Sequence, residues 1–426
     1  MSVESQGRRS RERSRTSMRD VLAVREFRGI VISQVASEAG DQIARVALAL
    51  LVLSHTGSPL FAAATFAVAF IPSFLGGALL GPVADRFSRR SLMLAADTGR
   101  AALIVLLALV AVPSTPLWVL FALLLVAEMF TPLFDSARAA TTPEVLGSVN
   151  LVATGAALSR VLSLANQAVG LVLGGLIVQF TSPRLALLLD GISFLVSYAV
   201  LVLFLKPRPA ALESTPSLGI LLKDLSRGWT LLMADRSRRA LVLLGWGMAL
   251  PLVAPEAVGL AYVNAEGEAD SWGGVLMAAV VAGAAVGAVL VGRRSPREQL
   301  DLVLPLAMLM SLPLLVTGIE PPVWILAGLW FVSGAAQAFL VPVMAFTTML
   351  TPNAQRGSVI GIAGAGFALL TALGYLVVGW VATVTSPAFS VVVMAVLGLV
   401  VASACYVVWP AARLRADVRA LEEHGL

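Results

Sequence analysis

Residues 81–90 read GPVADRFSRR and lie between two long apolar stretches of the chain. Four of these ten residues are charged, whereas Asp, Glu, Lys and Arg make up only 13% of the 426 residues. Hydrophobic residues make up 58% and the mean hydropathy is +0.89, which is outside the range of soluble domains. A charged segment between apolar stretches of this kind is typical of a short loop between two membrane-spanning helices.

Outward from this segment, apolar runs long enough to cross a bilayer of about 30 Å recur along the chain. They show no period-two alternation, so helices are favoured over a membrane barrel. The sequence predicts an all-α membrane protein with twelve transmembrane helices. The predicted spans are 28–53, 59–80, 91–112, 117–138, 150–179, 184–205, 239–263, 271–292, 300–318, 322–346, 357–384 and 387–409.

The basic residues are concentrated in every second connection between these spans. The N-terminal tail, segment 81–90, segment 206–238, segment 293–297 and the C-terminal tail hold most of the 30 Lys and Arg residues. The 7/8 loop on the opposite side carries Glu266, Glu268 and Asp270 instead. By the positive-inside rule, both termini are expected to be cytoplasmic.

Motifs for catalysis and metal binding are missing from the sequence. Cys405 is the single cysteine, and the two histidines, His55 and His424, lie near a loop and in a tail. The sequence contains no phosphate-binding loop, no nucleophile elbow and no paired-histidine zinc motif. We expect no enzyme activity, no catalytic residues, no metal and no cofactor.

The chain resembles itself at an offset of about 210 residues. GGALLGPVADR at 76–86 aligns with VGAVLVGRRSP at 286–296, and TTPEVLGSV at 141–149 aligns with LTPNAQRGSV at 350–359. The repeat predicts two pseudo-symmetric six-helix bundles. The expected division is a basic N-terminal tail at 1–27, an N-terminal bundle at 28–205, a cytoplasmic linker at 206–238, a C-terminal bundle at 239–409 and a cytoplasmic tail at 410–426.

The linker has the pattern of an amphipathic helix. Leu218, Leu222, Leu225, Trp229 and Leu232 recur at helical spacing, with basic residues between them. This pattern favours a helix on the cytoplasmic membrane surface, and a partly ordered linker is the alternative.

Gly81, Asp85, Arg86, Arg89 and Arg90 fit the signature G-x-x-x-D-R-x-x-R-R in the loop between the second and third spans. In this position, together with twelve spans, the chain resembles the major facilitator superfamily. SEAGDQIARVALALLVLSHTGSP at 37–59 and LMLAADTGRAALIVLLAL at 92–109 are similar to the proton-driven exporter branch that includes macrolide pumps and the enterobactin exporter. The resemblance covers residues 25–409.

The chain departs from the pattern of that branch at two positions. The fifth span reads GLVLGG at 170–175, so that Leu171 stands where drug antiporters have a proline. Because that motif is associated with export, the departure weakens the expectation of export over import. Ser88 replaces a glycine within the 2/3 signature, which is a substitution of one small residue by another.

Charged residues inside the predicted spans are the candidates for function, because an ion near the bilayer centre costs at least about 2.5 kcal/mol without a partner. Glu38, Asp41 and Arg45 lie on one face of the first span. A carboxylate there can bind and release a proton as its surroundings change. We expect Asp41 to couple transport to protons, with Glu38 and Glu128 next. The alternative for Asp41 is a static ion pair with Arg45.

The resemblance implies that the first, fourth, seventh and tenth spans line a central cavity. Glu128, Glu256 and Gln337 lie on the last three of these, and with Arg45 and Arg160 they form the expected substrate cavity. Three alternatives stay open. In the first, Glu128 forms a pair with Arg160 or a structural hydrogen bond to Asn166 or Gln167. In the second, Glu256 only faces the outer vestibule, and in the third, Arg160 contacts an anion.

By resemblance, segment 81–90 is also a conformational gate, in which Asp85 meets the N-terminal end of the eleventh helix across the two halves. Asp135, near the end of the fourth span, is the expected acidic partner of Arg89 or Arg90. The gate therefore comprises Gly81, Asp85, Arg86, Arg89, Arg90 and Asp135.

These features predict a proton-driven secondary exporter of a small hydrophobic compound in the bacterial plasma membrane. Uptake, lysophospholipid flipping and a non-transporting sensor or scaffold are the alternatives. The expected partners are the small-molecule substrate, protons and membrane lipids, with no nucleic acid, and the expected state is a monomer.

Overall fold

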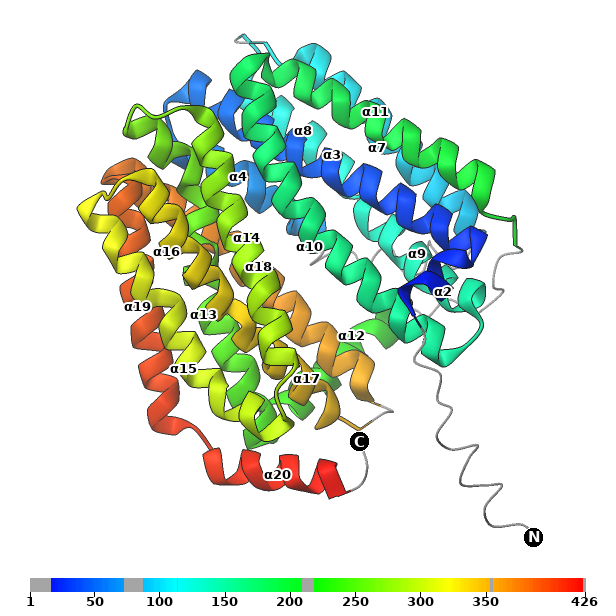
Figure 1. The fold of residues 1–426 in the computed structure, drawn as a ribbon, viewed down its shortest axis with the longest axis vertical. Helices are drawn as coiled ribbons and strands as arrows, with labels where there is room; N and C mark the ends of the chain where they lie inside the picture. Colours follow the sequence, from blue (N-terminus) through cyan, green and yellow to red (C-terminus); the bar gives the residue numbers. More distant parts are fainter. Residues whose placement is uncertain (1–16, 73–86, 113, 209–217, 353–354, 424–426) are drawn as a thin grey trace.

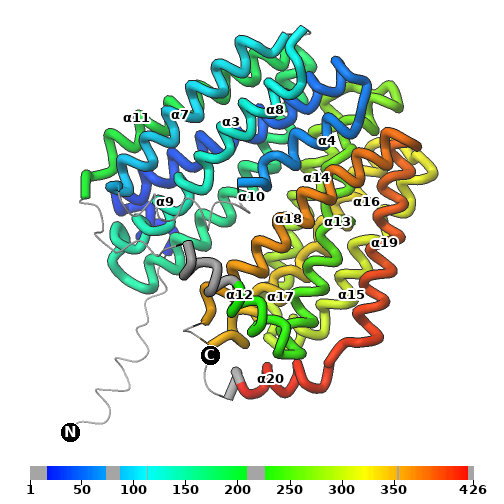
Figure 2. Tube along the Cα trace, turned by 180° about the vertical axis from the view of Figure 1, so that it is seen from behind, coloured from blue at the N-terminus to red at the C-terminus, as the bar shows by residue number. Residues whose placement is uncertain are grey.

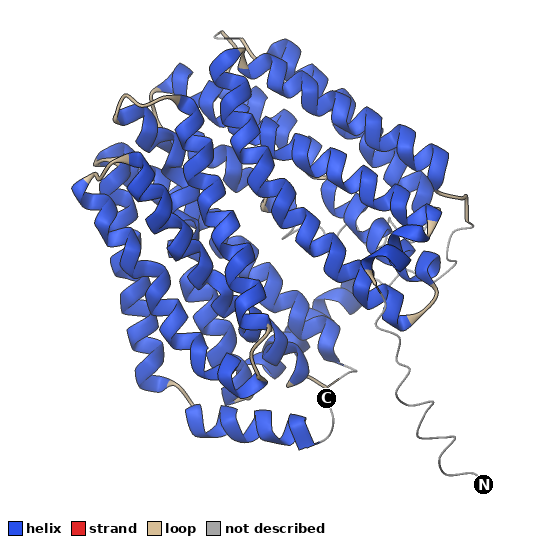
Figure 3. Ribbon diagram, in the orientation of Figure 1, coloured by secondary structure: helices blue, strands red, loops and turns tan. Residues whose placement is uncertain are grey.

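The structure is a computed structural model that describes residues 17–72, 87–112, 114–208, 218–352 and 355–423. The described part consists of helices joined by short loops, and no strand occurs in it (Figure 3). The helices form two bundles that lie side by side and follow each other along the chain (Figure 1).

The helices of the first half run from α2 to α11. Their bounds are Met18–Ala23 (α2), Arg25–Thr56 (α3), Pro59–Val68 (α4), Arg89–Val110 (α7), Leu117–Glu128 (α8), Thr131–Leu146 (α9), Val149–Phe180 (α10) and Pro183–Phe204 (α11).

The second half begins with α12, Leu218–Ala234, where the linker was predicted. Its other elements are Arg236–Ala265 (α13), Asp270–Gly292 (α14), Pro296–Leu315 (α15), Val316–Ile319 (η1), Val323–Ala336 (α16), Gln337–Phe339 (η2), Leu340–Met349 (α17), Arg356–Val384 (α18), Pro387–Val408 (α19) and Ala411–Glu423 (α20).

Helix starts follow local sequence signals. The side chains of Ser88, Ser148, Ser182 and Ser386 each accept a hydrogen bond from a backbone N–H in the first turn of the following helix. Such caps satisfy donors that no carbonyl of the helix reaches. The apolar runs therefore begin and end as separate helices with short connections.

Ten stretches of the described chain are long and apolar enough to cross a membrane. Two of the twelve predicted spans are not among them. The first coincides with α3, whose 32 residues carry Glu38, Asp41 and Arg45 in their interior. The second begins at α4, and its remainder lies largely outside the described residues.

The two halves contact each other at one end, which we call the closed end. It is formed by the loops near residues 57–58, 181–182, 266–269 and 385–386. Polar contacts join the two halves there: Ser58 and Leu60 contact the Thr383 hydroxyl, and the Ser271 N–H donates to Gln179. At the other end, which we call the termini end, lie α2 and α20, the first and last described helices, together with α12 (Figures 1 and 2).

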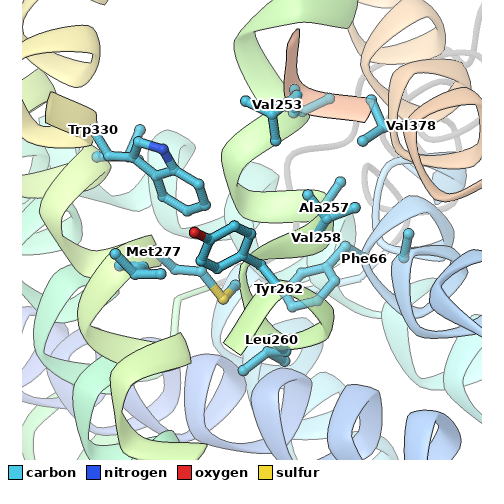
Figure 4. Close-up of a cluster of buried hydrophobic side chains, with 14 of the residues drawn as sticks. Phe66, Val253, Ala257, Val258, Leu260, Tyr262, Met277, Trp330 and Val378 are labelled. Atoms are coloured by element: carbon cyan, nitrogen blue, oxygen red, sulfur yellow. The ribbon is translucent and has the colours of Figure 1, made fainter. Parts of the chain in front are cut away.

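Close backbone approach holds the closed end together. A Cβ atom at Gly274 of α14 would lie 2.4 Å from the carbonyl oxygen of Leu171 in α10, so only glycine fits there. Leu171, which stands at the position of the antiporter proline, is fully buried at this seam. The largest apolar cluster spans both halves nearby and includes Phe66, Tyr262 and Trp330 (Figure 4).

The linker helix α12 packs on α18 of the second half. Trp229 stacks on Trp246 at a ring-centroid distance of 5.9 Å, and Leu232 is buried, while Trp229 stays half exposed. The side chains of residues 218–225 lie outside the described part.

Candidate functional site

The polar face of α3 was predicted to carry three functional residues. Glu38, Asp41 and Arg45 each contact a different helix of the first half. The long α3 therefore distributes its charges among partners on α7, α8, α9 and α10. The alternative for Asp41, a static ion pair with Arg45, is not found among the described residues, where Arg45 pairs with Glu128 and Asp41 faces Arg100.

Arg45 forms an ion pair with Glu128 of α8, with a distance of 3.1 Å between Nη2 and Oε1. Glu128 is only 7% exposed and also accepts a hydrogen bond from the Thr131 hydroxyl at 3.3 Å. Its partners are thus neither Asn166 nor Gln167 nor Arg160, and those alternatives are wrong.

The helix is interrupted beside this ion pair. α8 ends at Glu128, and Pro132 stands in the first turn of α9, where it cannot donate to the Glu128 carbonyl. Pro342 lies 210 residues later, beside the interruption at η2. The repeat therefore places a break, and a polar side chain beside it, in both halves.

Glu38 accepts three hydrogen bonds through Oε1. The donors are Gln34 at 3.0 Å, the Ser163 hydroxyl of α10 at 3.0 Å and Arg138 of α9 at 3.4 Å. Its other oxygen, Oε2, is buried and has no hydrogen-bond partner among the described atoms. Glu38 therefore has an acceptor that a proton can occupy.

Asp41 faces Arg100 of α7 at 4.0 Å rather than Arg45. Arg100 is held more tightly by Asp97, at 2.8 Å, and Asp97 also accepts a hydrogen bond of 2.6 Å from Ser197 of α11. The Arg100 guanidinium lies over the rings of Phe134 and Phe194 at 4.8 and 4.3 Å. Both members of the Asp97–Arg100 pair are buried.

Asp190 of α11 adds a third carboxyl group to this region. It is 1% exposed, accepts a hydrogen bond from the Ser193 hydroxyl at 3.1 Å and packs against Gly40 of α3. No cation of the described residues lies within ion-pair distance of it. Asp97 and Asp41 therefore share the guanidinium of Arg100, and Asp190 lies near them without a cation in ion-pair distance.

The second half contributes Glu256 and Gln337. Glu256 of α13 lies beside the Tyr375 hydroxyl and within electrostatic reach of Arg45 in the first half. Tyr375 in turn stacks on Phe66 at 5.7 Å. Gln337 donates to the Leu252 carbonyl at 3.5 Å, so it contacts α13 rather than a charged group.

Arg160 stays apart from these residues. Its side chain on α10 is exposed, and it forms no hydrogen bond or ion pair with another described residue. It is not brought to Glu128.

The predicted gate is described only in part, because Gly81, Asp85 and Arg86 lie outside the described residues. Arg89 pairs with Glu144 and donates to the Ala140 carbonyl at 3.0 Å, and Arg90 donates to the Val202 carbonyl at 3.0 Å.

The predicted pairing of Asp135 with Arg89 or Arg90 is wrong. Asp135 pairs with Arg138 at 2.9 Å, because the two residues lie one turn apart on α9.

Sequence reasoning missed Arg100 and Arg138 as partners of Asp41 and Glu38. Both arginines lie three residues after an aspartate, in Asp97–Arg100 and Asp135–Arg138. This spacing inside an apolar run was the available signal, since a buried arginine needs a counterion. Ser163 and Tyr375 had no such signal.

Comparisons with known proteins agree on the family. The model of the Major Facilitator Superfamily matches residues 30–319 and 239–424. The chain is 36% identical over 89 residues to uncharacterized MFS-type transporters of Mycobacterium tuberculosis and Mycobacterium bovis, which is 20% of each chain. It is 26% identical over 185 residues to the uncharacterized MFS-type transporter YfiS of Bacillus subtilis, or 43% of each chain. These matches span less than half the length of the relatives.

Among solved structures, the nucleoside transporter NupG matches 90% of this chain and 99% of its own, with a TM-score of 0.72 and 15% identity. A single-substitution variant of NupG gives a TM-score of 0.75 at 14% identity. At this identity the match concerns the fold alone. With the family model covering both halves, the chain belongs to the major facilitator superfamily, a family of multi-pass membrane transporters and not of enzymes.

Proposed function

We propose that the protein is a proton-coupled exporter of a small hydrophobic compound that works by alternating access. The observation that carries this proposal is the ion pair between the half-buried Arg45 and the buried Glu128, among the helices of the first half. A buried carboxylate whose charge is balanced by one guanidinium changes its interactions when it binds a proton.

Protonation of Glu128 removes the charge that holds Arg45. Glu256 of the second half is then the carboxylate toward which Arg45 is drawn, because the two groups already interact electrostatically. One proton thus changes the attraction between the two halves. Proton binding is coupled to alternating access when the attraction between the halves, and hence the relative free energy of the two conformations, depends on whether the proton is bound.

Glu38 and Asp41 are the further proton-binding candidates. Glu38 has an unpartnered buried oxygen, and Asp41 is weakly held by Arg100 at 4.0 Å. Gln337 and Arg160 remain candidates for contact with the substrate.

We assign the termini end to the cytoplasm of a bacterial plasma membrane, as the distribution of basic residues predicts. The described conformation then has its halves joined on the outer side. Segment 81–90, with Gly81, Asp85, Arg86, Arg89 and Arg90, would join them on the inner side in the opposite conformation. Asp135 is left out of this gate, because it pairs with Arg138 on its own helix.

Uptake and lysophospholipid flipping are the alternatives within transport, and Leu171 at the antiporter-motif position keeps them open. A sensor or scaffold is disfavoured because buried carboxylates are costly and serve no purpose there. The monomer is the proposed functional unit.

Proton coupling is tested in proteoliposomes with an imposed pH gradient, using ethidium and erythromycin as the transported probes. We expect probe-dependent proton flux in the wild type, its loss in Glu128→Gln, and its retention in the control Glu268→Gln, an exposed carboxylate at the closed end. Flux that is unchanged in Glu128→Gln would contradict the assignment of Glu128. The absence of proton flux with either probe in the wild type would contradict coupled export of such compounds.

A further inference from the structure

A cavity of about 510 Å³ opens at the termini end of the first half, away from the seam between the halves. It is bounded by the starts of α3 and α7 and by the end of α11, which lie together in Figure 1. Arg25, Glu26, Arg90, Leu203 and Lys206 line it. None of these residues takes part in the proton-binding group described above.

The cavity carries an excess of positive charge. Its one carboxylate, Glu26, is bound by the Arg208 guanidinium through two hydrogen bonds of 2.8 and 3.1 Å. Burial alone would raise the pKa of Glu26, but the hydrogen bonds from Arg208 and from the Lys206 N–H lower it overall, so Glu26 is ionised at neutral pH and matched by Arg208. Within the described chain, Arg25, Arg90 and Lys206 have no carboxylate in ion-pair distance.

Two of these cations are held in place by the end of α11. Arg90 donates to the Val202 carbonyl at 3.0 Å, and its buried Nε has no hydrogen-bond partner among the described atoms. Arg25 donates to the Leu203 carbonyl at 3.4 Å and lies over the Phe204 ring at 5.6 Å. Arg90 is also the second residue of α7, where the helix dipole favours an anion. The guanidinium groups are therefore positioned without having their charge neutralised.

The wall next to these cations is apolar and faces outward. Leu203 is 68% exposed, and Ile192, Leu195 and Val202 of the same helix are also exposed. On a membrane-spanning helix, such a row of residues faces the acyl chains of the bilayer. The cationic cavity thus lies where this lipid-facing surface ends.

The equivalent place in the second half gives a comparison within the same chain. A cavity of about 400 Å³ lies between the start of α15 and the end of α19. There Arg415 pairs with Asp301 at 2.9 Å, so its charge is matched. The unmatched positive charge is therefore a property of the first-half cavity and not of this position in both halves.

We propose that the first-half cavity binds the phosphate of an anionic glycerophospholipid, whose acyl chains lie along the exposed face of α11. Arginine forms paired hydrogen bonds with phosphate oxygens, and Arg90 has a guanidinium N–H group, on Nε, that no described acceptor takes. Lys206 and Arg25 add point charge at the membrane surface. The bound lipid connects the starts of α3 and α7 to the end of α11. This proposal does not depend on the direction or the substrate of transport.

Lipid retention by the full-length purified protein tests the proposal. The protein is reconstituted in nanodiscs of phosphatidylglycerol and phosphatidylcholine. After the protein is released from the nanodiscs in the mass spectrometer, the lipids that remain bound to it are counted by native mass spectrometry. We expect one phosphatidylglycerol molecule to be retained preferentially. Arg25→Gln and Lys206→Gln should each weaken its binding about fivefold, as expected for one cation at an anionic surface. Arg415→Gln, in the equivalent cavity, is the matched control and should have no effect.

Three results would overturn the proposal. Equal retention of the two lipids would show that the cavity does not select an anionic headgroup. An equal loss in Arg415→Gln would show that overall surface charge accounts for the binding. Displacement of phosphatidylglycerol by millimolar inorganic phosphate would show that a free anion, rather than a lipid, is the ligand. Correct folding of each variant is checked by its thermal unfolding midpoint, and none of these measurements requires transport activity.

Discussion

The Arg45 guanidinium on α3 and the Glu128 carboxylate on α8 are 3.1 Å apart and form an ion pair between two helices of the first half. Glu128 is the last residue of α8, and the chain bends directly after it. The pair therefore connects the charged face of α3 to the point where the fourth predicted span is interrupted.

Removal of one member of this pair is expected to destabilise the protein more than removal of both. Glu128→Ala removes the carboxylate that pairs with the partly buried Arg45 guanidinium, whereas the double variant Arg45→Leu with Glu128→Leu removes both charges and leaves neither one unpaired. Thermal unfolding in detergent should show the lowest midpoint for the single variant. A double variant that is less stable than Glu128→Ala would contradict this interpretation of the pair.

Neutralising Asp97 is expected to lower the stability of the protein more than neutralising Asp190, although both carboxyl groups lie near Arg100. Asp97 is bound to Arg100 at 2.8 Å, whereas Asp190 is bound only to a serine hydroxyl. Asp97→Asn should therefore lower the unfolding midpoint clearly, because it weakens the main counterion of a buried guanidinium. Asp190→Asn should change the midpoint little, since the amide replaces a carboxyl group that has no cation beside it. Equal losses in the two variants would show that Asp190 is held by charge after all.

The closed end is expected to depend on glycine at position 274. Gly274→Val places a side chain against the Leu171 carbonyl, where even a Cβ atom would be 2.4 Å away. The variant should shift the population toward conformations in which this end is open. Spin labels at Thr181→Cys and Glu268→Cys, in a Cys405→Ser background, report the separation of the two halves there. Gly292→Val on the same helix, where nothing lies within 4 Å of the added Cβ, is the control that should leave the separation unchanged.

The ion pair between Glu26 and Arg208 predicts a pH dependence of stability. The pKa of Glu26 is lowered in the folded protein, because the hydrogen bonds from Arg208 and Lys206 outweigh the effect of burial. Its contribution is therefore fully present above the unfolded-state pKa, about 4.3, and is lost as the pH falls through the lower folded-state value. Glu26→Gln should lower the unfolding midpoint at pH 7 and have a smaller effect in acid.

Arg208→Gln is the complementary variant for this pair. It should reproduce the loss at pH 7, and the double variant should lose no more than either single one, because the partners share one interaction. Additive losses would show that the two residues stabilise the protein independently.

Much of the helix arrangement could be predicted from the sequence because helix ends and apolar lengths are local properties. Serine caps, prolines at helix starts and charged loops mark the connections, and ten of the predicted spans coincide with apolar helices. The sequence also predicts the first span, and the structure has the helix α3 there, although its interior carries the charged residues Asp41 and Arg45.

The pairing of charged residues could not be predicted from spacing along one helix. Asp41 and Arg45 are neighbours on α3, but α7 and α8 provide Arg100 and Glu128 as the partners. Asp135 shows the opposite case, because its partner Arg138 is one turn away on its own helix rather than on another helix. Sequence distance does not determine which of these alternatives is formed, because helices that are distant in the chain are brought equally close by packing.

The sequence by itself determined that the chain is helical, apolar and duplicated, because a bilayer allows only helices whose backbone groups are bonded internally, and because the repeat is visible in the residues themselves. The tertiary structure alone decided that Arg45 meets Glu128 and that the halves are joined at one end. It also decided that Arg25, Arg90 and Lys206 surround one cavity. These relationships depend on the angles and the register at which helices pack, and no single helix encodes them.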